Sequence, residues 1–314
     1  MKKFEEGNAK EQIMAIHKRF RNVEYWQAIK RTAPPYTAAK YLKGMDMYFD
    51  EDGNIVYDLI PSITDYLVRN KVSGIYICGS TGEGPSLTLE ERKAVTEAYI
   101  ESAGDRLRKV VHVGHTALQD AQNLAAHAEE KGADAISAIS PYYFKPGNST
   151  ILAEFMKEAA GAAPSLPFYY YHIPSLTGVA VNPVEFLQIA ADKIPNLRGM
   201  KYSDPDVSIF NDCQALMDSR FDLLYGWDEM LLSALVIDAK GAVGSTYNFA
   251  PGLYRRVIDA YEAGDLNSAR VWQRKAVAMI RSITSVGGEA AIKYPMHRRG
   301  LDCGPRRLPM RQLT

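Results

Sequence analysis

Short runs of apolar residues alternate with longer amphipathic segments from about residue 60 to residue 248. The short runs are rich in β-branched and aromatic residues and are bounded by turn-forming residues, which is typical of buried strands. Seven runs are predicted as strands: residues 73–80, 109–116, 134–140, 167–174, 197–203, 221–228 and 241–248. The intervening segments favour helices, because apolar side chains recur at helical spacing, as in residues 117–131.

Two features of this pattern mark helix boundaries. Thr88 and Glu91 have the spacing of a capping box, in which a threonine hydroxyl accepts a bond from the third helical N–H and the glutamate reaches back. After Asn248 the strand-like runs stop, and residues 251–263 and 265–285 are predicted as helices. Pro251 suits a first helical position. A helical region therefore follows the last strand.

The number of strands indicates the fold class. Seven strands with intervening helices, and one more strand before residue 60, match a closed α/β barrel of the (β/α)8 TIM type better than an open doubly wound sheet. The expected organisation is an N-terminal extension (residues 1–40), the barrel (41–250) and a C-terminal helical region packed on the barrel (251–314). The first strand has two candidate positions, residues 37–42 and residues 41–49, and the pattern does not choose between them.

Composition narrows the classes of partner. The chain has 314 residues, 46% of them hydrophobic, which is enough for a full core. The 37 basic residues balance the 37 acidic ones, so nothing indicates nucleic acid or a membrane surface, and a small molecule is the expected partner. Three widely spaced cysteines, no apolar leader and no apolar run of about 18 residues predict a cytoplasmic protein with reduced thiols.

Lys201 ends an apolar, strand-like run and is the first candidate for chemistry. Moving an ammonium group out of water is costly, so a lysine in such a place is paired with a carboxylate, reaches to solvent, or is partly neutral and nucleophilic. In a barrel the C-terminal ends of the strands share one mouth, and other unusual motifs also end strands here. Because these motifs would lie near Lys201 at the mouth of the barrel, they favour a nucleophilic lysine that forms a Schiff base.

The loop at residues 79–84, with the sequence Gly-Ser-Thr-Gly-Glu-Gly, follows a predicted strand and precedes the capped helix. Its glycines let the backbone approach a ligand, and its N–H groups and hydroxyls suit a small anion such as a carboxylate. A tight strand-to-helix turn needs similar residues, so the loop alone does not decide. It is not a P-loop, because no Lys-Ser/Thr pair follows it, and it is not a dinucleotide fingerprint, because its glycines do not fall as G-x-G-x-x-G.

Tyr171 ends another predicted strand and is a candidate general acid or base. A phenol has a reference pKa of about 10, so it acts near neutral pH only where a cation or hydroxyl stabilises its phenolate. Lys201 and Thr81 are the candidates for that role. The chain has 19 tyrosines, and since most tyrosines only pack, a structural role is the alternative.

Two more pairs of polar residues end predicted strands. Asp228 and Glu229 are adjacent carboxylates that suit hydrogen bonds to the hydroxyls of a polyol, although acidic residues are also common at helix N-termini. His112 and His115, three residues apart on a strand, would face opposite sides. We therefore expect core or loop histidines and no metal site.

Five motifs in order resemble those of the dihydrodipicolinate synthase and N-acetylneuraminate lyase superfamily. They are residues 79–83 (GSTGE), 171–178 (YHIPSLTG), 199–201 (GMK), 226–229 (GWDE) and 244–248 (GSTYN). The resemblance runs from about residue 50 to residue 309. It implies a homotetrameric class I aldolase on a (β/α)8 barrel that needs no metal or cofactor. The branch that cleaves N-acetylneuraminate to pyruvate and N-acetylmannosamine is the most similar.

The resemblance also implies roles for single residues. Lys201 resembles the Schiff-base lysine and Tyr171 the proton-transfer tyrosine. Ser80 and Thr81 resemble the residues that hold the pyruvate carboxylate, and Tyr143 resembles a tyrosine that a neighbouring subunit contributes to the hydroxyl relay. The expected catalytic set is Lys201, Tyr171, Tyr143 and Thr81, and the positions that match contacts with the sugar-derived part are Ser203, Gly226, Asp228, Glu229 and Ser245.

The sequence departs from the family pattern near the N-terminus, where residues 47–49 (Met-Tyr-Phe) replace a Thr-Pro-Phe-like turn. Two alternative functions remain. Dihydrodipicolinate synthase condenses pyruvate with aspartate semialdehyde, but Leu176 stands where that enzyme commonly has an arginine. A barrel that only binds a ligand would be expected to lack the lysine or the tyrosine, and both are present.

Overall fold

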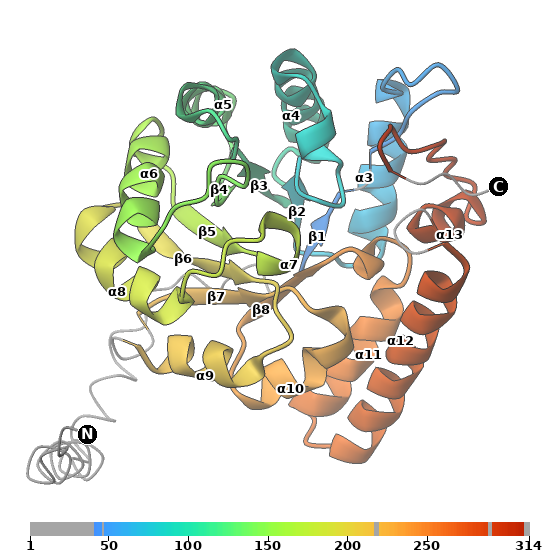
Figure 1. Cartoon of the computed structure of the whole chain (residues 1–314). Helices are drawn as coiled ribbons and strands as arrows, with labels where there is room; N and C mark the ends of the chain where they lie inside the picture. Colours follow the sequence, from blue (N-terminus) through green and yellow to red (C-terminus); the bar gives the residue numbers. More distant parts are fainter. Residues whose placement is uncertain (1–40, 46, 217–219, 288–290, 311–314) are drawn as a thin grey trace, which may run out of the picture. The chain divides into compact units, whose positions relative to one another are not determined.

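The computed structural model describes residues 41–45, 47–216, 220–287 and 291–310. The predicted N-terminal extension lies outside these residues. All of the described residues belong to one compact unit. Its centre is a closed barrel of parallel strands that follow one another in chain order, with the last strand pairing with the first (Figure 1). The predicted fold class, a (β/α)8 barrel followed by C-terminal helices, is confirmed.

The strands are β1 (Tyr41–Gly44), β2 (Gly74–Ile77), β3 (Arg108–His112), β4 (Ala135–Ile139), β5 (Phe168–His172), β6 (Leu197–Tyr202), β7 (Asp222–Tyr225) and β8 (Gly241–Gly244). Most of them are shorter than the apolar runs that predicted them, because the last residues of each run belong to loops at the barrel mouth. β1 starts at the first residue of the second candidate range, 41–49, but ends at Gly44. Met47, Tyr48 and Phe49 are buried outside the strand.

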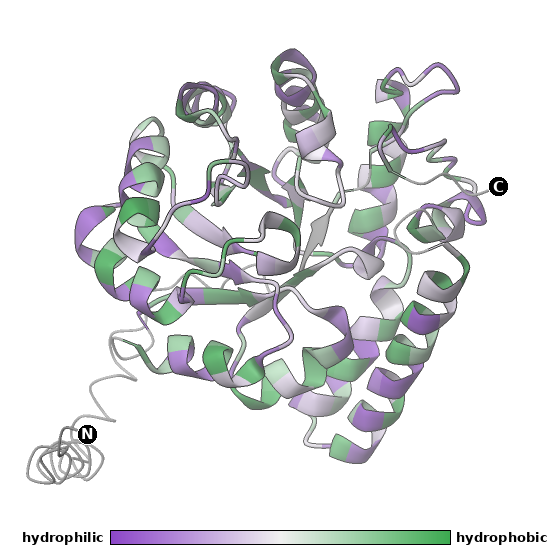
Figure 2. Cartoon of the chain, viewed as in Figure 1, coloured by the Kyte–Doolittle hydropathy of each residue, from purple (hydrophilic) through white to green (hydrophobic). Residues whose placement is uncertain are grey.

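Helices follow the strands and surround them. They are α3 (Ile60–Arg69), α4 (Leu89–Ala103), α5 (Leu118–Glu130), α6 (Ser149–Gly161), α7 (Pro174–Thr177), α8 (Pro183–Lys193), α9 (Val207–Ala215), α10 (Leu231–Val236), α11 (Pro251–Glu262), α12 (Leu266–Gly287) and α13 (Tyr294–His297). The predicted capping box at α4 is present, with Thr88 and Glu91 bonding each other's backbone. Hydrophobic and hydrophilic residues alternate along these helices (Figure 2), as expected for helices with one buried face.

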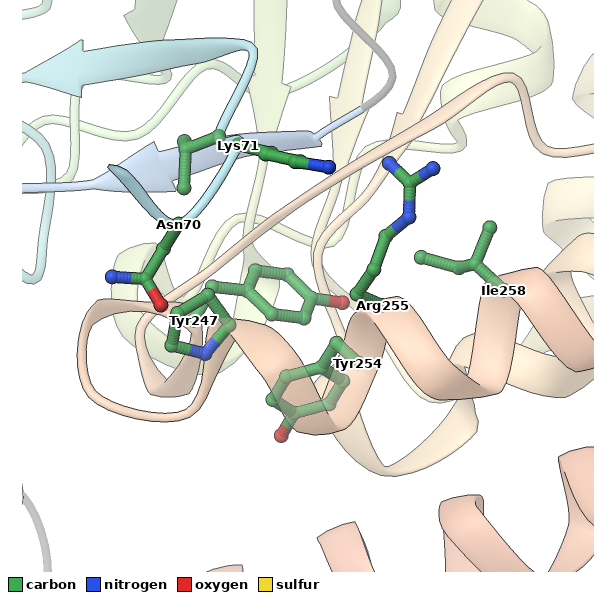
Figure 3. A pocket seen from close by; sticks show the side chains of 8 residues that line it. Asn70, Lys71, Tyr247, Tyr254, Arg255 and Ile258 are labelled. Atoms are coloured by element: carbon green, nitrogen blue, oxygen red, sulfur yellow. The ribbon is translucent and has the colours of Figure 1, made fainter. Parts of the chain in front are cut away.

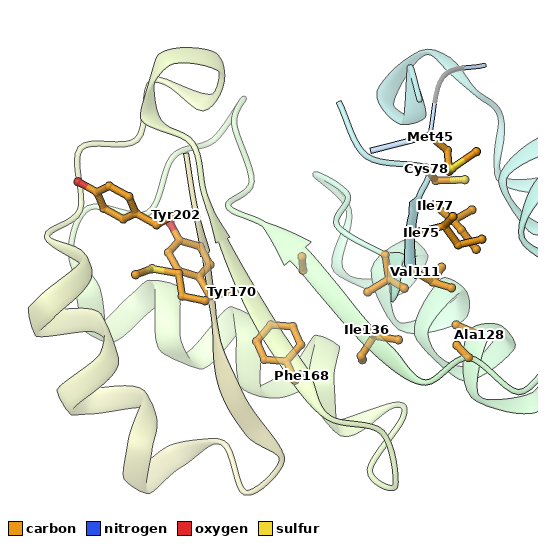
Figure 4. Close-up of a cluster of buried hydrophobic side chains, with 14 of the residues drawn as sticks. Met45, Ile75, Ile77, Cys78, Val111, Ala128, Ile136, Phe168, Tyr170 and Tyr202 are labelled. Atoms are coloured by element: carbon orange, nitrogen blue, oxygen red, sulfur yellow. The ribbon is translucent and has the colours of Figure 1, made fainter. Parts of the chain in front are cut away.

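Successive residues of each strand face either the barrel interior or the helices. On β5, Phe168 and Tyr170 belong to the layer between strands and helices, together with Tyr202 of β6 (Figure 4). Tyr171 belongs instead to the cluster inside the barrel. Lys201 is the register partner of Tyr171 and alternates with Tyr202, so it also faces the interior.

Among the described residues, short 3-10 helices lie in the loops: η1 (Tyr57–Leu59), η2 (Gly84–Ser86), η4 (Asp228–Met230) and η5 (Thr246–Asn248). η4 immediately precedes α10, and η5 lies between β8 and α11. Helices α11 and α12 share a buried cluster with Leu231 of α10 and Ala242 of β8. The segment after α12 lies against the start of α4, where Arg307 binds Glu91 at 2.6 Å, and Arg307 also bonds the carbonyl oxygens of Gly53 and Ser86 in the loops before α3 and α4. Residues after the barrel therefore support two of its loops.

Candidate active site

Lys201 is buried at the end of β6, with 6% of its surface exposed. Its Nζ lies 3.8 Å from the ring centroid of Tyr171 and 4.4 Å from that of Tyr76. Among the described residues no carboxylate lies within ion-pair distance of this amine. Within the described part of the chain, Lys201 is therefore neither paired with a carboxylate nor extended into solvent, which leaves the third explanation, a partly neutral and nucleophilic amine. The geometry is that of an amine held between aromatic rings and available to a ligand.

Tyr171 ends β5 beside this amine and is 3% exposed. Its hydroxyl lies 3.4 Å from Oγ of Ser80, so the hydroxyl neighbour expected at Thr81 is instead found at Ser80. The Tyr171 ring packs edge-on against Tyr76, with centroids 5.7 Å apart. This packing fixes the phenol, while the hydroxyl reaches the loop that follows β2.

Thr81 and Ser245 join the loops after β2 and β8. Their hydroxyl oxygens are 2.6 Å apart. The sequence predicted Thr81 for the carboxylate end of a ligand and Ser245 for the sugar-derived part, and the structure brings the two side chains into contact. Ser80 and Thr81 thus lie on the same side of the barrel as Lys201, where a carboxylate next to a ketone could be held.

The glycines of this loop serve the fold of the loop itself. A Cβ on Gly84 would lie 2.0 Å from the carbonyl oxygen of Cys78, and one on Gly82 would lie 2.7 Å from that of Met45. The close approach is therefore to protein backbone. The N–H groups of Glu83 and Gly84 bond the carbonyl oxygens of Ser80 and Gly79 within the loop, so these two donors are not free for an anion.

The predicted sugar-contacting residues cluster at the ends of β6, β7 and β8. Ser203 follows β6 and is buried, and a Cβ on Gly226 would lie 2.0 Å from its Oγ. Likewise a Cβ on Gly244 would lie 1.8 Å from Oδ1 of Asp228. These positions need glycine because side chains that line the mouth occupy the space. Glu229 is only partly buried.

Asp228 is the carboxyl of this cluster with the most distinctive environment. Its Oδ2 accepts bonds from the N–H of Thr246 at 3.0 Å and from its hydroxyl at 2.5 Å. Its Oδ1 is buried without a hydrogen-bond partner in the described part of the chain. Burial raises the pKa of Asp228 to about 6, against the effect of the two bonds from Thr246. Thr246 therefore holds Asp228 through one carboxylate oxygen only, while the other lies against Gly244.

Tyr143 is not brought to this cluster within its own chain. It lies in the loop after β4, is 77% exposed, and packs edge-on against Phe144, which is 87% exposed. The structure thus assembles Lys201, Tyr171, Ser80 and Thr81 and leaves Tyr143 at the surface. Leu176 in α7 is exposed and brings no cation near the site.

The two histidines do not share a site. His112 is buried at the end of β3, where its Nε2 lies 3.2 Å from the N–H of Ile139 and its carbonyl accepts a bond from Arg92. His115 lies in the following loop, 3.4 Å from Asp120. Among the described residues no group of three or more histidine, cysteine, aspartate or glutamate side chains is placed to hold a metal.

Two residues near the site were missed by sequence reasoning. Tyr76 on β2 flanks the amine of Lys201 and donates to Oγ of Ser137 at 2.7 Å. Its only signal is a polar aromatic residue in the middle of an apolar strand. Thr246, which holds Asp228, lies within the GSTYN motif but had no assigned role. A surface pocket lined by Lys71, Tyr254 and Arg255 contains none of the predicted site residues (Figure 3).

Within the described residues, no helix has both the length and the apolar character needed to cross a membrane.

Comparison with protein families matches residues 38–314 to the dihydrodipicolinate synthetase family. N-acetylneuraminate lyase of Rattus norvegicus is 44% identical over 269 residues, 84% of each chain. The human enzyme of the same name is 42% identical over the same length.

Solved structures agree with these relatives. N-acetylneuraminate lyase from Proteus mirabilis superposes with a TM-score of 0.86 at 37% identity, and the match covers 88% of this chain and 94% of that one. The sialic acid aldolase from Aliivibrio salmonicida gives the same TM-score and identity. The fold, the buried lysine at the end of β6 and these matches confirm the predicted relationship: the chain belongs to the dihydrodipicolinate synthetase family, among relatives named N-acetylneuraminate lyase.

Proposed function

We propose that this protein is a Schiff-base aldolase that cleaves N-acetylneuraminate to pyruvate and N-acetylmannosamine. The observation that carries the proposal is the amine of Lys201, buried between two tyrosine rings and paired in register with Tyr171. The family relationship supports it, because relatives more than 40% identical are named N-acetylneuraminate lyase. The reaction runs in both directions.

The residues account for each step. Ser80 and Thr81 hold the carboxylate of the open-chain 2-keto acid so that the C2 ketone faces Nζ of Lys201. The neutral amine attacks C2, and loss of water gives a protonated imine. Tyr171, as phenolate, takes the proton of the C4 hydroxyl; the C3–C4 bond then breaks, its electron pair passes to the imine as an enamine, and the aldehyde leaves. Tyr171 returns that proton to C3 of the enamine, which regenerates the protonated imine, and water then hydrolyses the imine to pyruvate and the free amine.

The other end of the site recognises the polyol. Oδ1 of Asp228 has no partner among the described residues, and Glu229 is adjacent and partly exposed. We infer that these carboxylates, with Ser203 and Ser245, accept hydrogen bonds from the hydroxyls of the sugar. A site built on such bonds discriminates strongly against analogues that lack the hydroxyls, because buried acceptors are then left unpaired.

Assembly and compartment belong to the same proposal. Tyr143 and Phe144 are exposed on one loop, which suits a surface covered by another subunit of a homotetramer. Tyr143 would then bring its hydroxyl to the hydroxyl groups of the neighbouring subunit's active site. The three cysteines are buried and unbridged, which fits a reducing, cytoplasmic environment.

Trapping with borohydride tests the chemistry. Reduction in the presence of pyruvate is expected to add a lactyl-type mass to the peptide that contains Lys201, and Lys201→Arg is expected to abolish this label. Lys109, also buried but bonded to Asp134 at 3.3 Å, provides a control, and Lys109→Arg should still be labelled. A label on another lysine, or no label, would contradict the assignment of Lys201.

A panel of 2-keto acids tests the substrate. We expect pyruvate release from N-acetylneuraminate and no efficient condensation of pyruvate with aspartate semialdehyde, since Leu176 offers no cation for a second carboxylate. Glu229→Ala is expected to raise KM for the sugar acid while pyruvate labelling of Lys201 is largely kept. Efficient formation of the dihydrodipicolinate precursor would instead place the protein with the synthases.

A further inference from the structure

One side chain outside the barrel bonds three backbone groups of the loop that carries Asp228 and Glu229. Gln273 of α12 donates from Nε2 to the carbonyl oxygens of Asp228 at 3.2 Å and Glu229 at 2.9 Å. Its Oε1 accepts a bond from the N–H of Leu232 at 3.0 Å. Gln273 is 45 residues from Asp228 in sequence and is only 9% exposed.

These bonds replace capping that the loop does not provide for itself. Neither η4 nor α10 has a side-chain cap at its N-terminus, and the N–H groups of a first helical turn have no partner within the helix. A primary amide supplies donors and an acceptor from one planar group, which neither a carboxylate nor an ammonium can do. Gln273 is therefore matched to two carbonyls and one N–H at once.

The side chain of Asp228 is anchored separately, from α11. The hydroxyl of Tyr254 is hydrogen-bonded to that of Thr246, and Thr246 donates to Oδ2 of Asp228. Tyr254 is 2% exposed, so this chain of bonds is shielded from water. α12 thus holds the backbone of the loop, and α11 orients the carboxylate.

We propose that Gln273 is a positioning residue for substrate specificity, which fixes the backbone at Asp228 and Glu229 so that their carboxylates meet the polyol end of the substrate. This role rests on the proposed function for its substrate. Gln273 touches neither Lys201 nor the Ser80–Thr81 loop in the described contacts, so it acts on sugar recognition and leaves imine formation unchanged.

The test compares two variants of the same helix. Gln273→Met keeps the length of the side chain and removes all three hydrogen bonds. Ile280→Ala creates a cavity at a buried position of α12 that has no bond to the loop, and so controls for loss of stability alone. For each variant, KM and kcat for N-acetylneuraminate, borohydride trapping with pyruvate, and amide hydrogen exchange of residues 226–236 are measured.

Gln273→Met is expected to raise KM for the sugar acid about tenfold, the usual scale for a buried hydrogen bond, and to keep pyruvate trapping within about twofold. Exchange of the 226–236 peptide should accelerate in this variant and not in Ile280→Ala. Unchanged KM, or equal losses in trapping and sugar cleavage, would overturn the proposal. If the wild type traps pyruvate but cleaves no sugar acid, the substrate is wrong, while the exchange result still decides whether Gln273 holds the loop.

Discussion

Asp228 shows at the residue scale how one buried carboxyl couples folding to pH. Its pKa in the folded protein is about 6, which lies above the unfolded value of about 4. The folded state therefore holds the proton more tightly, so the stabilisation is full below about pH 4 and is lost as the pH rises to about 6. Asp228→Asn should remove this pH dependence. Between about pH 4 and pH 7, the free energy of unfolding of the wild type relative to that of the variant is expected to fall by on the order of 2 kcal/mol.

His172 provides a control of opposite sign. Burial lowers its pKa to about 4, below the unfolded value of about 6.5, so its contribution is full above about pH 6.5 and is lost as the pH falls toward 4. His172→Gln should therefore make the protein less sensitive to acid over this range. If both variants changed the pH dependence of the free energy of unfolding in the same direction, the opposite effects of burial on the pKa values of Asp228 and His172 would be contradicted.

Tyr171 is the residue whose role separates chemistry from packing. Tyr171→Phe keeps the ring that packs against Tyr76 and Lys201 and removes the hydroxyl beside Ser80. We expect kcat for N-acetylneuraminate cleavage to fall by about 10² or more, with the melting temperature little changed, because general acid-base catalysis is typically of that size. Near-normal turnover would mean that Tyr171 only packs.

At the scale of elements, the segment after α12 is tied to the loop that follows β2 by Glu83. Its carboxylate lies 2.9 Å from Nζ of Lys293 and 3.5 Å from the guanidinium of Arg306, and both cations are almost fully buried. Glu83→Gln would remove the carboxylate that faces these two buried cations, and breaking a buried ion pair by removing one member typically costs about 3 to 5 kcal/mol. We expect a loss of that size in urea unfolding, and weaker pyruvate binding because Ser80 and Thr81 share the loop.

Glu91→Gln is the matched control for this prediction. Glu91 pairs with Arg307 on the same segment, but both side chains are partly exposed, at 26% and 22%. Partly exposed pairs are worth about 1 kcal/mol or less, so this variant should lose far less stability and keep pyruvate binding. Equal losses from Glu83→Gln and Glu91→Gln would show that burial of the Glu83 cluster is not decisive.

The elements themselves were largely predictable from the sequence, and their long-range contacts were not. Seven apolar runs gave seven strands, because a strand buried on both faces is marked locally. The ends of those runs gave Lys201, Tyr171, Ser80 and Thr81. Glu83 and Arg306 are 223 residues apart and meet only once the barrel is closed, so no local pattern marks their contact. The same holds for Gln273.

At the scale of the whole molecule, the separation between the assembled cluster and the exposed Tyr143 predicts shared sites. Lys201→Arg lacks the amine, and Tyr143→Phe lacks the hydroxyl that would serve a neighbour, so each variant alone should cleave N-acetylneuraminate poorly. When the two are co-expressed, half of the reciprocal pairs are mixed, and one of the two sites in each mixed pair has its own Lys201 and the partner's Tyr143. A symmetric pair therefore predicts about a quarter of the wild-type activity. Sedimentation should show a tetramer for both variants, so that lost activity is not lost assembly. A mixture no more active than the variants alone would mean that Tyr143 does not act across a subunit boundary.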